Sequence, residues 1–228
     1  MKCLILASGF GTRLYPLTLT KAKALVEYKG KPLLTHIVDK VPRNIDILVS
    51  CNRKFETDFY RWQENLGRQV EICVEDVWAD DQRKGAIGSL NFWVNGKRIA
   101  EDLLVIAGDN YFEFDLAQFI AAYDGKHALV AVYDIGDKSK ASQFGVVELD
   151  KNRIVQFEEK PAIPRSSLIA TACYVFPPRI LSMLHDYWQL GERDNLGAFI
   201  AHLVDREELH AYTFTELWLD IGTAESLS

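Results

Sequence analysis

The chain has 228 residues, of which 48% are hydrophobic and 25% are charged, an ordinary globular composition that is long enough for a sizeable core. Its formal net charge of −6 argues against a general nucleic-acid-binding protein, whose binding surface is usually basic. No apolar run approaches the roughly 20 residues of a membrane span, and the first residues have a strand pattern rather than that of a secretory signal. We therefore expect no nucleic-acid or membrane partner and a cytoplasmic location, in which the four cysteines are buried, reduced thiols.

Short apolar runs alternate with amphipathic stretches through the first half of the chain. This pattern predicts strands at 2–7, 45–50, 70–74 and 103–107, and helices at 32–41, 53–66, 86–99 and 116–123. Such alternation is typical of a mostly parallel sheet that is covered by helices on both faces. The nearly all-apolar strands "CLIL", "IDILV" and "LLVIA" favour the same arrangement, because neither face of the sheet is then exposed to water.

After about residue 125 the pattern becomes rich in strands. The segments "HALVAVYD", "FGVVELD", "RIVQFEEK" and "LIATACYVF" predict partly antiparallel strands, followed by helices at 178–188 and 197–204 and by short strands at 210–214 and 217–220. The fold class is therefore α/β: a three-layer, doubly wound, mixed and mostly parallel sheet. We expect a single domain over residues 1–228, with halves at 1–125 and 126–228.

The segment "LASGFGTRLYPLTLTKAKAL" follows the first strand directly. In open α/β sheets ligands bind beyond the carboxyl ends of the strands, and glycines there let backbone N–H groups approach an anion. A dinucleotide-binding fingerprint would need a third glycine where Leu14 stands, and a P-loop would need a Gly-Lys-Ser/Thr that is absent. Arg13 and either Lys21 or Lys23 remain as cations that can reach the turn, although any tight strand-to-helix turn also favours glycine.

The longer string "LASGFGTRLYPLTLTKAKALVEYKGKPLL" resembles the signature of the sugar-phosphate nucleotidyltransferases, the family of glucose-1-phosphate thymidylyltransferase and other NDP-sugar pyrophosphorylases. Ser8 replaces the first of the family's paired glycines, and Lys23 falls at the family's lysine, which makes Lys21 a bystander. The resemblance extends over nearly the whole chain and matches a short form without a C-terminal extension. It implies a Rossmann-like nucleotidyltransferase fold, with a nucleotide-binding half at 1–125 and a strand-rich sugar-phosphate-binding half at 126–228.

The resemblance also implies roles for residues in the first half. Arg13 and Lys23 would be catalytic. Nucleotide binding would involve Leu6, Ala7, Ser8, Gly9, Gly11, Thr12, Arg13, Gly85 and Gly88. No base-reading side chain is assigned within 75–84, where this chain has a longer charged loop than the family pattern.

Two carboxylates complete the implied catalytic centre. "LLVIAGDNYF" matches the family's Gly-Asp-Asn strand end at Asp109, and "LWLDIGTAESL" matches its closing Trp-x-Asp-x-Gly-Thr at Asp220. Together they are expected to bind Mg²⁺, because hard cations prefer carboxylate and phosphate oxygens. From the residues alone, Asp109 also suits a helix cap and Asp220 a simple turn.

The sugar-phosphate side is implied by "FGVVELD" and "FEEKPAIPRSSLIATACYVF". The residues expected there are Asn110, Gly145, Glu159, Lys160, Thr171 and, with a poorer flanking match, Arg193. Without the resemblance, the segment 158–161 is a solvated strand end that a proline terminates.

The function that follows is the joining of a nucleoside triphosphate and a sugar 1-phosphate, with release of pyrophosphate. Overall similarity favours thymidylyl or uridylyl transfer to glucose 1-phosphate. A CTP- or GTP-using relative with another phosphorylated acceptor, a catalytically silent regulatory homologue and a nucleotide-sugar glycosyltransferase stay open as alternatives. The sequence leaves open whether the chain is a monomer or a small homo-oligomer.

Overall fold

The computed structural model describes residues 1–191 and 194–222. Among them, the main strands are β1 Lys2–Leu6, β4 Asp46–Asn52, β5 Glu71–Glu75, β6 Leu103–Ala107, β8 Ala128–Asp134, β9 Gly145–Asp150, β10 Arg153–Glu159, β11 Leu168–Phe176 and β12 Leu209–Phe214. The helices are α1 Leu33–Lys40, α2 Glu56–Glu64, α3 Gly85–Gly96, α4 Leu116–Ala121, α5 Pro178–Gln189 and α6 Leu196–Val204. Each lies within a few residues of the element that the sequence pattern predicts.

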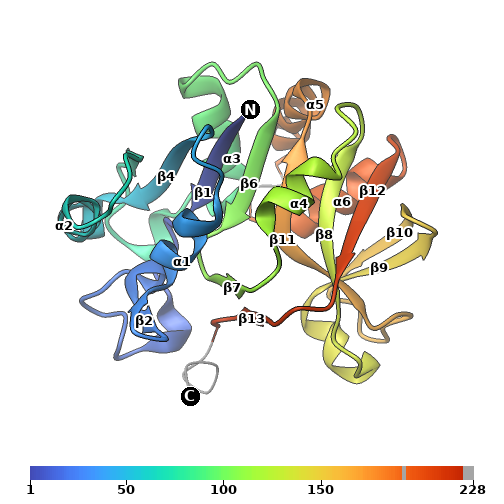
Figure 1. Ribbon diagram of the computed structural model, residues 1–228, viewed down its shortest axis with the longest axis horizontal. Coiled ribbons are helices and arrows are strands. Elements are labelled where there is room, and N and C mark those ends of the chain that lie inside the picture. The colour runs from blue at the N-terminus through green and yellow to red at the C-terminus, as the bar shows by residue number, and fades with distance from the viewer. Residues whose placement is uncertain (192–193, 223–228) are drawn as a thin grey trace.

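These nine strands form one mixed sheet in the order β5-β4-β1-β6-β11-β8-β12-β10-β9 (Figure 1). The first four strands are parallel, β8 and β12 run in the same direction, and β11 and β10 run against the rest. The carboxyl ends of β1 and β6 therefore lie side by side at one edge of the sheet. The α/β fold with a mixed sheet is confirmed: seven of the nine strands run in the same direction, although only four of the nine pairings between them are parallel.

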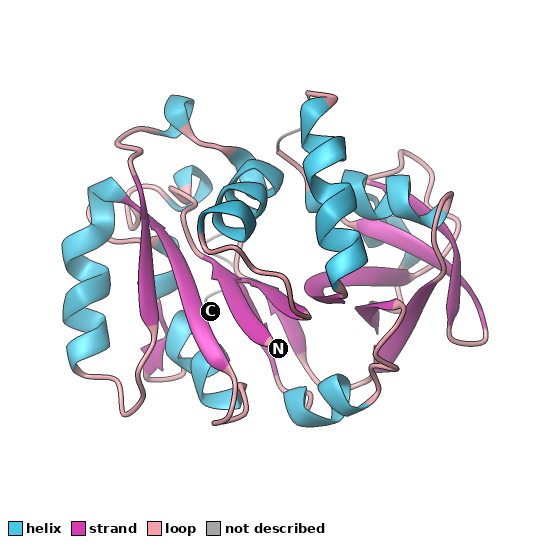
Figure 2. Cartoon of the chain, turned by 90° about the horizontal axis from the view of Figure 1, so that it is seen from above, coloured by secondary structure: helices cyan, strands magenta, loops and turns pink. Residues whose placement is uncertain are grey.

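Helices cover both faces of the sheet (Figure 2). Alternate residues of β1 show why: Cys3 and Ile5 belong to the core that includes α1, α2 and α4, whereas Leu4 packs in the core that includes α3, α5 and α6. All three are fully buried. Because successive side chains of a strand point to opposite faces, a strand buried on both faces is apolar at every position.

Two small pairs of strands lie outside the main sheet. β7 (Asn110–Phe112) pairs antiparallel with β13 (Trp218–Asp220), below the carboxyl ends of the strands in Figure 1. β2 (Glu27–Tyr28) pairs with β3 (Lys31–Pro32). The sequence pattern predicts β13 but not its partner β7, because three residues carry too little periodicity to identify a strand.

The four cysteines are buried and free of disulfide bonds, as expected. Among the described residues, no helix combines the length and the apolar character that a membrane crossing requires. The sheet takes strands from both 1–125 and 126–228, and each of the two cores that flank it contains residues of both halves.

Candidate active site

The glycine-containing loop begins where β1 ends, and two contacts from β4 hold its start. The Ala7 N–H donates to Ser50 Oγ at 3.1 Å, and Asn52 Nδ2 donates to the Ser8 carbonyl at 3.1 Å. Ser50 and Asn52 are almost fully buried polar residues at the end of β4. Their hydrogen bonds fix the loop backbone, which leaves Ser8 partly open and Gly9 exposed to solvent.

Gly11 is needed for the approach of a lysine. It has a left-handed φ of 64°, and a Cβ at this position would lie 2.9 Å from Lys23 Cβ and 3.1 Å from a Thr18 methyl carbon. A 3₁₀ turn, Thr12–Leu14, starts directly after it. Glycine is therefore required here for two reasons: it leaves space for the aliphatic part of the Lys23 side chain to pack against the loop, and it adopts the left-handed φ without strain.

Lys23 lies between the two predicted carboxylates. Its Nζ is 2.8 Å from Asp109 Oδ2 and 4.0 Å from Asp220 Oδ1, and its side chain is only 15% exposed. Lys21, in contrast, is exposed and pairs with Glu27 at 3.8 Å. The structure thus brings Lys23, rather than Lys21, to the carboxyl edge of the sheet.

The strand pair β7–β13 brings the two acids together. Asp220 is the register partner of Asn110, and the Ile221 N–H donates to the Asp109 carbonyl at 3.1 Å. Gly108 precedes Asp109 and lets the chain pass close to the end of β1, since a Cβ there would lie 2.9 Å from Ala7 Cβ. Residues 111 positions apart in the chain therefore become neighbours (220 − 109).

The charges around Asp220 act in opposite directions. Burial and the negative charge of Asp109 raise the pKa of Asp220, while the positive charges of Lys23, Arg13 and Lys160 lower it, and the net shift is upward. A pair of close carboxylates disfavours simultaneous ionisation unless a cation balances it. The same five residues therefore form one electrostatic cluster, drawn from four separate segments of the chain.

Two cavities meet at this cluster. The first, about 250 Å³, is lined by backbone and small side chains of the loop after β1 and by the start of α3; its wall includes Leu6, Ala7, Ser8, Gly9, Lys23, Gly85 and Asp109. The second, about 470 Å³, lies beside β9, β10 and β11, and its wall includes Arg13, Asp109, Asn110, Gly145, Glu159, Lys160, Thr171 and Asp220. Asp109 belongs to both walls.

Asn110 and Thr171 line the second cavity, but their side chains are already hydrogen-bonded inside the protein. Asn110 Nδ2 donates to the Thr171 carbonyl at 2.6 Å, and Thr171 Oγ1 donates to the Ala131 carbonyl at 3.1 Å. Both bonds lie at the irregular stretch of β11, where Ala172 has a positive φ of 54°. They hold this part of the cavity wall in shape.

Gly145 and Glu159 lie together at the far end of the second cavity. A Cβ on Gly145 would lie 2.3 Å from Phe157 Cζ and 3.1 Å from Glu159 Oε2, so only glycine fits. Glu159 Oε1 accepts from Asn195 Nδ2 at 2.8 Å. Lys160 is more exposed and follows β10 with a positive φ of 46°.

The remaining predicted residues lie elsewhere. Gly11 and Thr12 support the loop without lining either cavity, and Gly88 lines a separate cavity on the outer side of α3. Arg193 lies outside the described residues.

Several lining residues were not predicted from the sequence. Glu75, at the end of β5, is almost completely buried and faces the first cavity, where its Oε1 accepts from Ser89 Oγ and from Trp93 Nε1. Its position at the end of a strand parallel to β6, at the same end of the sheet as Asp109, could have identified it as a residue that lines the site. The other residues lie where the fold brings the segment before α3 against the start of α6: Arg83 and Lys84 in the former, and Asp194, Asn195 and Gly197 in the latter.

The donor set suits a divalent cation with oxygen ligands. Asp109 and Asp220 direct carboxylate oxygens toward the same point. Lys23 Nζ lies near this point, so the two acids already accommodate one positive charge. Hard cations such as Mg²⁺ use one or two carboxylates and complete their shell with phosphate oxygens and water. The arrangement can therefore position two phosphate-bearing molecules, one in each cavity, against a shared centre of charge.

Comparison with known proteins agrees with this geometry. The sequence profile described as Nucleotidyl transferase matches residues 2–228. Two relatives are each 30% identical over 97% of this chain: the bifunctional protein GlmU of Methanocaldococcus jannaschii and a candidate mannose-1-phosphate guanyltransferase of Sulfolobus acidocaldarius. The chain spans only 51% and 60% of their respective lengths.

Among solved structures, a candidate glucose-1-phosphate thymidylyltransferase from Bacillus anthracis, in complex with sucrose, superposes with a TM-score of 0.85 at 25% identity. The match covers 100% of this chain and 92% of that one. The fold, the loop after β1 and the profile match agree, and the chain belongs to the nucleotidyl transferase family.

Proposed function

We propose that this chain is a sugar-1-phosphate nucleotidyltransferase, which converts a nucleoside triphosphate and a sugar 1-phosphate into an NDP-sugar and pyrophosphate. The observation that carries the proposal is the acid pair with Lys23 at the meeting point of the two cavities. The first cavity suits the triphosphate, because loop backbone and cations line it. The second suits the acceptor, because polar groups of β9–β11 line it.

In the proposed reaction, an oxygen of the sugar phosphate attacks the α-phosphorus, and the bond to the pyrophosphate oxygen breaks. The attacking phosphate is already ionised near neutral pH, so the chain needs no general base. The loop around Ser8 and Gly9 holds the phosphates of the triphosphate, while Arg13 and Lys23 balance the charge that moves to the leaving group. Arg13 offers forked donors and Lys23 a compact charge.

Asp109 and Asp220 would hold Mg²⁺ in this proposal. A bound divalent ion neutralises phosphate charge and orients the phosphate oxygens for in-line displacement. Lys23 would then contact phosphate oxygens, since its present partner Asp109 would be shared with the ion. Glu159, fixed by Asn195, and Lys160 would bind the sugar and its phosphate.

Which nucleobase the triphosphate carries is a more specific part of the proposal. Overall similarity favours thymidylyl or uridylyl transfer to glucose 1-phosphate, while one relative is named for guanylyl transfer. Glu75 adds a chemical constraint, because a carboxylate lining the first cavity accepts hydrogen bonds from a base. Guanine presents two adjacent donors on its Watson–Crick edge, whereas thymine and uracil present one donor between two acceptors. GTP is therefore the second candidate beside dTTP and UTP, and CTP stays in the comparison.

A grid of dTTP, UTP, CTP and GTP against several sugar 1-phosphates, with Mg²⁺ and pyrophosphate as readout, tests the proposal. We expect turnover for at least one pair, and a loss of about 100- to 1,000-fold for Asp109→Asn with the fold retained. Release of nucleoside diphosphate instead of pyrophosphate would identify a glycosyltransferase. No turnover with any pair would favour a silent regulatory homologue, although Arg13, Lys23, Asp109 and Asp220 are all present here.

The same proposal places the enzyme in the cytoplasm, where the four buried cysteines stay reduced. It makes no use of nucleic acid or of a membrane. Whether the chain acts as a monomer or as a homo-oligomer is an open part of the proposal, and a measured mass in solution decides it.

A further inference from the structure

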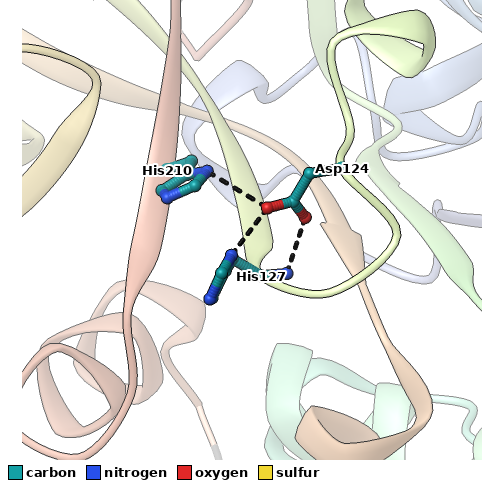
Figure 3. Close-up of side chains that lie close together, drawn as sticks. All are labelled: Asp124, His127 and His210. Carbon is teal, nitrogen blue, oxygen red and sulfur yellow. Dashed lines mark hydrogen bonds and ion pairs between the residues drawn. The ribbon is translucent and has the colours of Figure 1, made fainter.

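A cluster of two histidines and one aspartate lies at the opposite edge of the sheet from the candidate active site. His127 directly precedes β8, His210 is the second residue of β12, and Asp124 lies in the loop before β8 (Figure 3). β8 and β12 are parallel neighbours, so both strands begin at this edge. One ligand atom from each of the three residues lies within 4.8 Å of the others. The proposed transfer reaction uses none of them.

The loop fixes the Asp124 carboxylate. Its Oδ1 accepts from the backbone N–H groups of Lys126 and His127, both at 2.8 Å. Its Oδ2 is left for the two imidazoles, at 2.6 Å from His127 Nδ1 and 3.6 Å from His210 Nδ1 (Figure 3). The two rings are tilted by 41° with their centroids 4.7 Å apart, so both Nδ1 atoms face one carboxylate oxygen.

Glu208 determines which nitrogen of His210 carries the proton. His210 Nε2 lies 2.9 Å from Glu208 Oε1, and a carboxylate accepts hydrogen bonds, so Nε2–H is the donor. In the neutral ring, Nδ1 then carries a lone pair, and this lone pair faces Asp124 Oδ2. Two acceptors in this position need a cation between them, either a second proton on His210 or a metal ion.

The contacts favour a metal ion of the zinc class. A histidine that donates its other ring N–H to a carboxylate is the usual arrangement behind a metal-bound imidazole. Two imidazoles and one carboxylate suit Zn²⁺, Co²⁺, Ni²⁺ or Cu²⁺, whereas Mg²⁺ and Ca²⁺ prefer oxygen ligands alone. The side chains are 15% (His127), 19% (His210) and 36% (Asp124) exposed, which gives an ion access and leaves room for water as a fourth ligand.

We propose that Asp124, His127 and His210 form a binding site for one divalent transition-metal ion, with Zn²⁺ as the reference ion and Glu208 as the residue that orients His210. Ligand atoms about 2.0–2.2 Å from zinc in tetrahedral geometry lie about 3.4 Å apart. His127 Nδ1, now 2.6 Å from Asp124 Oδ2, would therefore move away from it by less than about 1 Å, and its proton would move to Nε2. Ligand atoms that lie as far as 4.8 Å apart would have to approach one another to reach this spacing. Arg153, the register partner of His210 on β10, adds a positive charge nearby, so coordination bonds rather than net charge would hold the ion.

The consequence of binding is a link between two strands. The ion would join the loop before β8 to the start of β12, and it would bind the folded chain only, since these segments come together on folding. Ligand that binds only the folded state raises Tm, here by about 5–10 °C at a zinc concentration of about 100 times Kd.

The test uses the full chain after treatment with a chelator. Calorimetric titration with ZnCl₂ should give one site per chain, Tm should rise, and Co²⁺ should give the visible absorption of a tetrahedral site. His127→Gln and His210→Gln should each remove these signals, and Glu208→Gln should weaken binding by about 10- to 100-fold. Any change of Tm with Mg²⁺ should be the same in His210→Gln as in the parent chain, because the proposed Mg²⁺ ligands are Asp109 and Asp220. His185→Gln, outside the cluster, should bind zinc as the parent chain does.

Two results would overturn the site. One is the absence of stoichiometric zinc or cobalt binding in the folded parent chain, in which case a second proton on His210 explains the geometry. The other is binding that survives both His127→Gln and His210→Gln, which would assign the ion to other ligands. If a glutamine variant unfolds at room temperature, the cobalt spectrum of Glu208→Gln, with its ligand set intact, decides in its place. None of these readouts depends on the transferase reaction, so failure of one proposal leaves the other intact.

Discussion

Gly197 offers a sharp test of the acceptor site, because a single methyl group at this position would displace Glu159. Gly197 is the second residue of α6 and has no side chain to contribute. A Cβ there would lie 1.8 Å from Glu159 Oε2 and 2.6 Å from Glu159 Cδ. Both distances are far below any real contact, so in Gly197→Ala the carboxylate has to swing away from α6.

The expected cost to stability is small. Displacement of Glu159 breaks its hydrogen bond from Asn195, which costs about 1.5–3 kcal/mol where one partner is charged. Alanine in place of glycine within a helix returns up to about 1 kcal/mol. The free energy of unfolding should therefore fall by about 0.5–3 kcal/mol, and the variant should stay folded at room temperature.

The expected cost to activity is larger and specific to one substrate. If Glu159 binds the sugar, loss of that charged hydrogen bond lowers kcat/KM for the sugar 1-phosphate by about 10- to 150-fold. KM for the triphosphate should change little, because Glu159 and Gly197 line only the second cavity. Pyrophosphate release with varied sugar 1-phosphate, at saturating triphosphate, measures both quantities.

Gly96→Ala is the matched control. Gly96 ends α3, and a Cβ there would meet nothing within 4 Å, so this variant should keep the parent kinetics. Glu159→Gln should reproduce most of the acceptor defect without any steric change. A folded Gly197→Ala whose acceptor kinetics equal those of Gly96→Ala would remove Glu159 from the acceptor site.

Three further outcomes are expected. Lys23→Met should keep the fold but lower kcat by about 100-fold or more, since it removes the positive charge proposed to contact the phosphate oxygens. Lys21→Met should match the parent chain in the same pyrophosphate assay, because Lys21 pairs with Glu27 at the surface. Glu75→Gln should change the ratio of kcat/KM between triphosphates by about tenfold or more and leave KM for the sugar 1-phosphate unchanged; an unaltered ratio would show that Glu75 does not contact the base. Burial lowers the pKa of His36 below its ordinary 6.5 despite a hydrogen bond to a backbone carbonyl, so the unfolded chain takes up this proton first as pH falls. The stabilisation that comes from the neutral ring is present above about pH 6.5 and is lost as pH falls below it. In urea unfolding between pH 8 and 5, the free energy of unfolding should therefore fall less steeply for His36→Gln than for the parent chain.

The sequence pattern predicted the elements of the main sheet because their burial is encoded locally. Apart from Lys2, β1 and β6 are apolar at every position, and small residues end or follow each strand at the same end of the sheet. The loop after Ala7 and the acid at Asp109 could therefore be placed together from the chain alone. The pairing of Asp109 with Asp220 could only be implied by resemblance. It depends on the ladder between β7 and β13, two strands of three residues that come together from distant segments, and so short a segment has no periodicity of its own.

The tertiary contacts of several side chains also could not be predicted from the sequence pattern. Glu75 stands in a charged stretch that resembles a solvated loop, and only the fold shows that Ser89 and Trp93 bind its carboxylate inside a cavity. Gly197 and Asn195 are ordinary helix-start residues until β10 brings Glu159 against them. In each case the informative distance joins residues from different elements, and a periodicity within one element carries no information about it.

The charge distribution explains how an acidic chain can suit a highly anionic substrate. The net charge of −6 disfavours long polyanions, which contact a wide surface. Among the residues that the structure describes, the wall of the first cavity is instead balanced in charge: it holds three cations (Lys23, Arg83 and Lys84) and three acids (Glu75, Asp109 and Asp194), while the loop from Leu6 to Gly9 adds no charged side chain. Because screening at physiological ionic strength limits the reach of distant charges to about 8 Å, a small anion responds to these neighbours rather than to the whole chain. A long nucleic acid would meet the negative charge of the whole surface, whereas a compact polyphosphate would meet only the charges of the cavity wall, so the compact molecule is favoured.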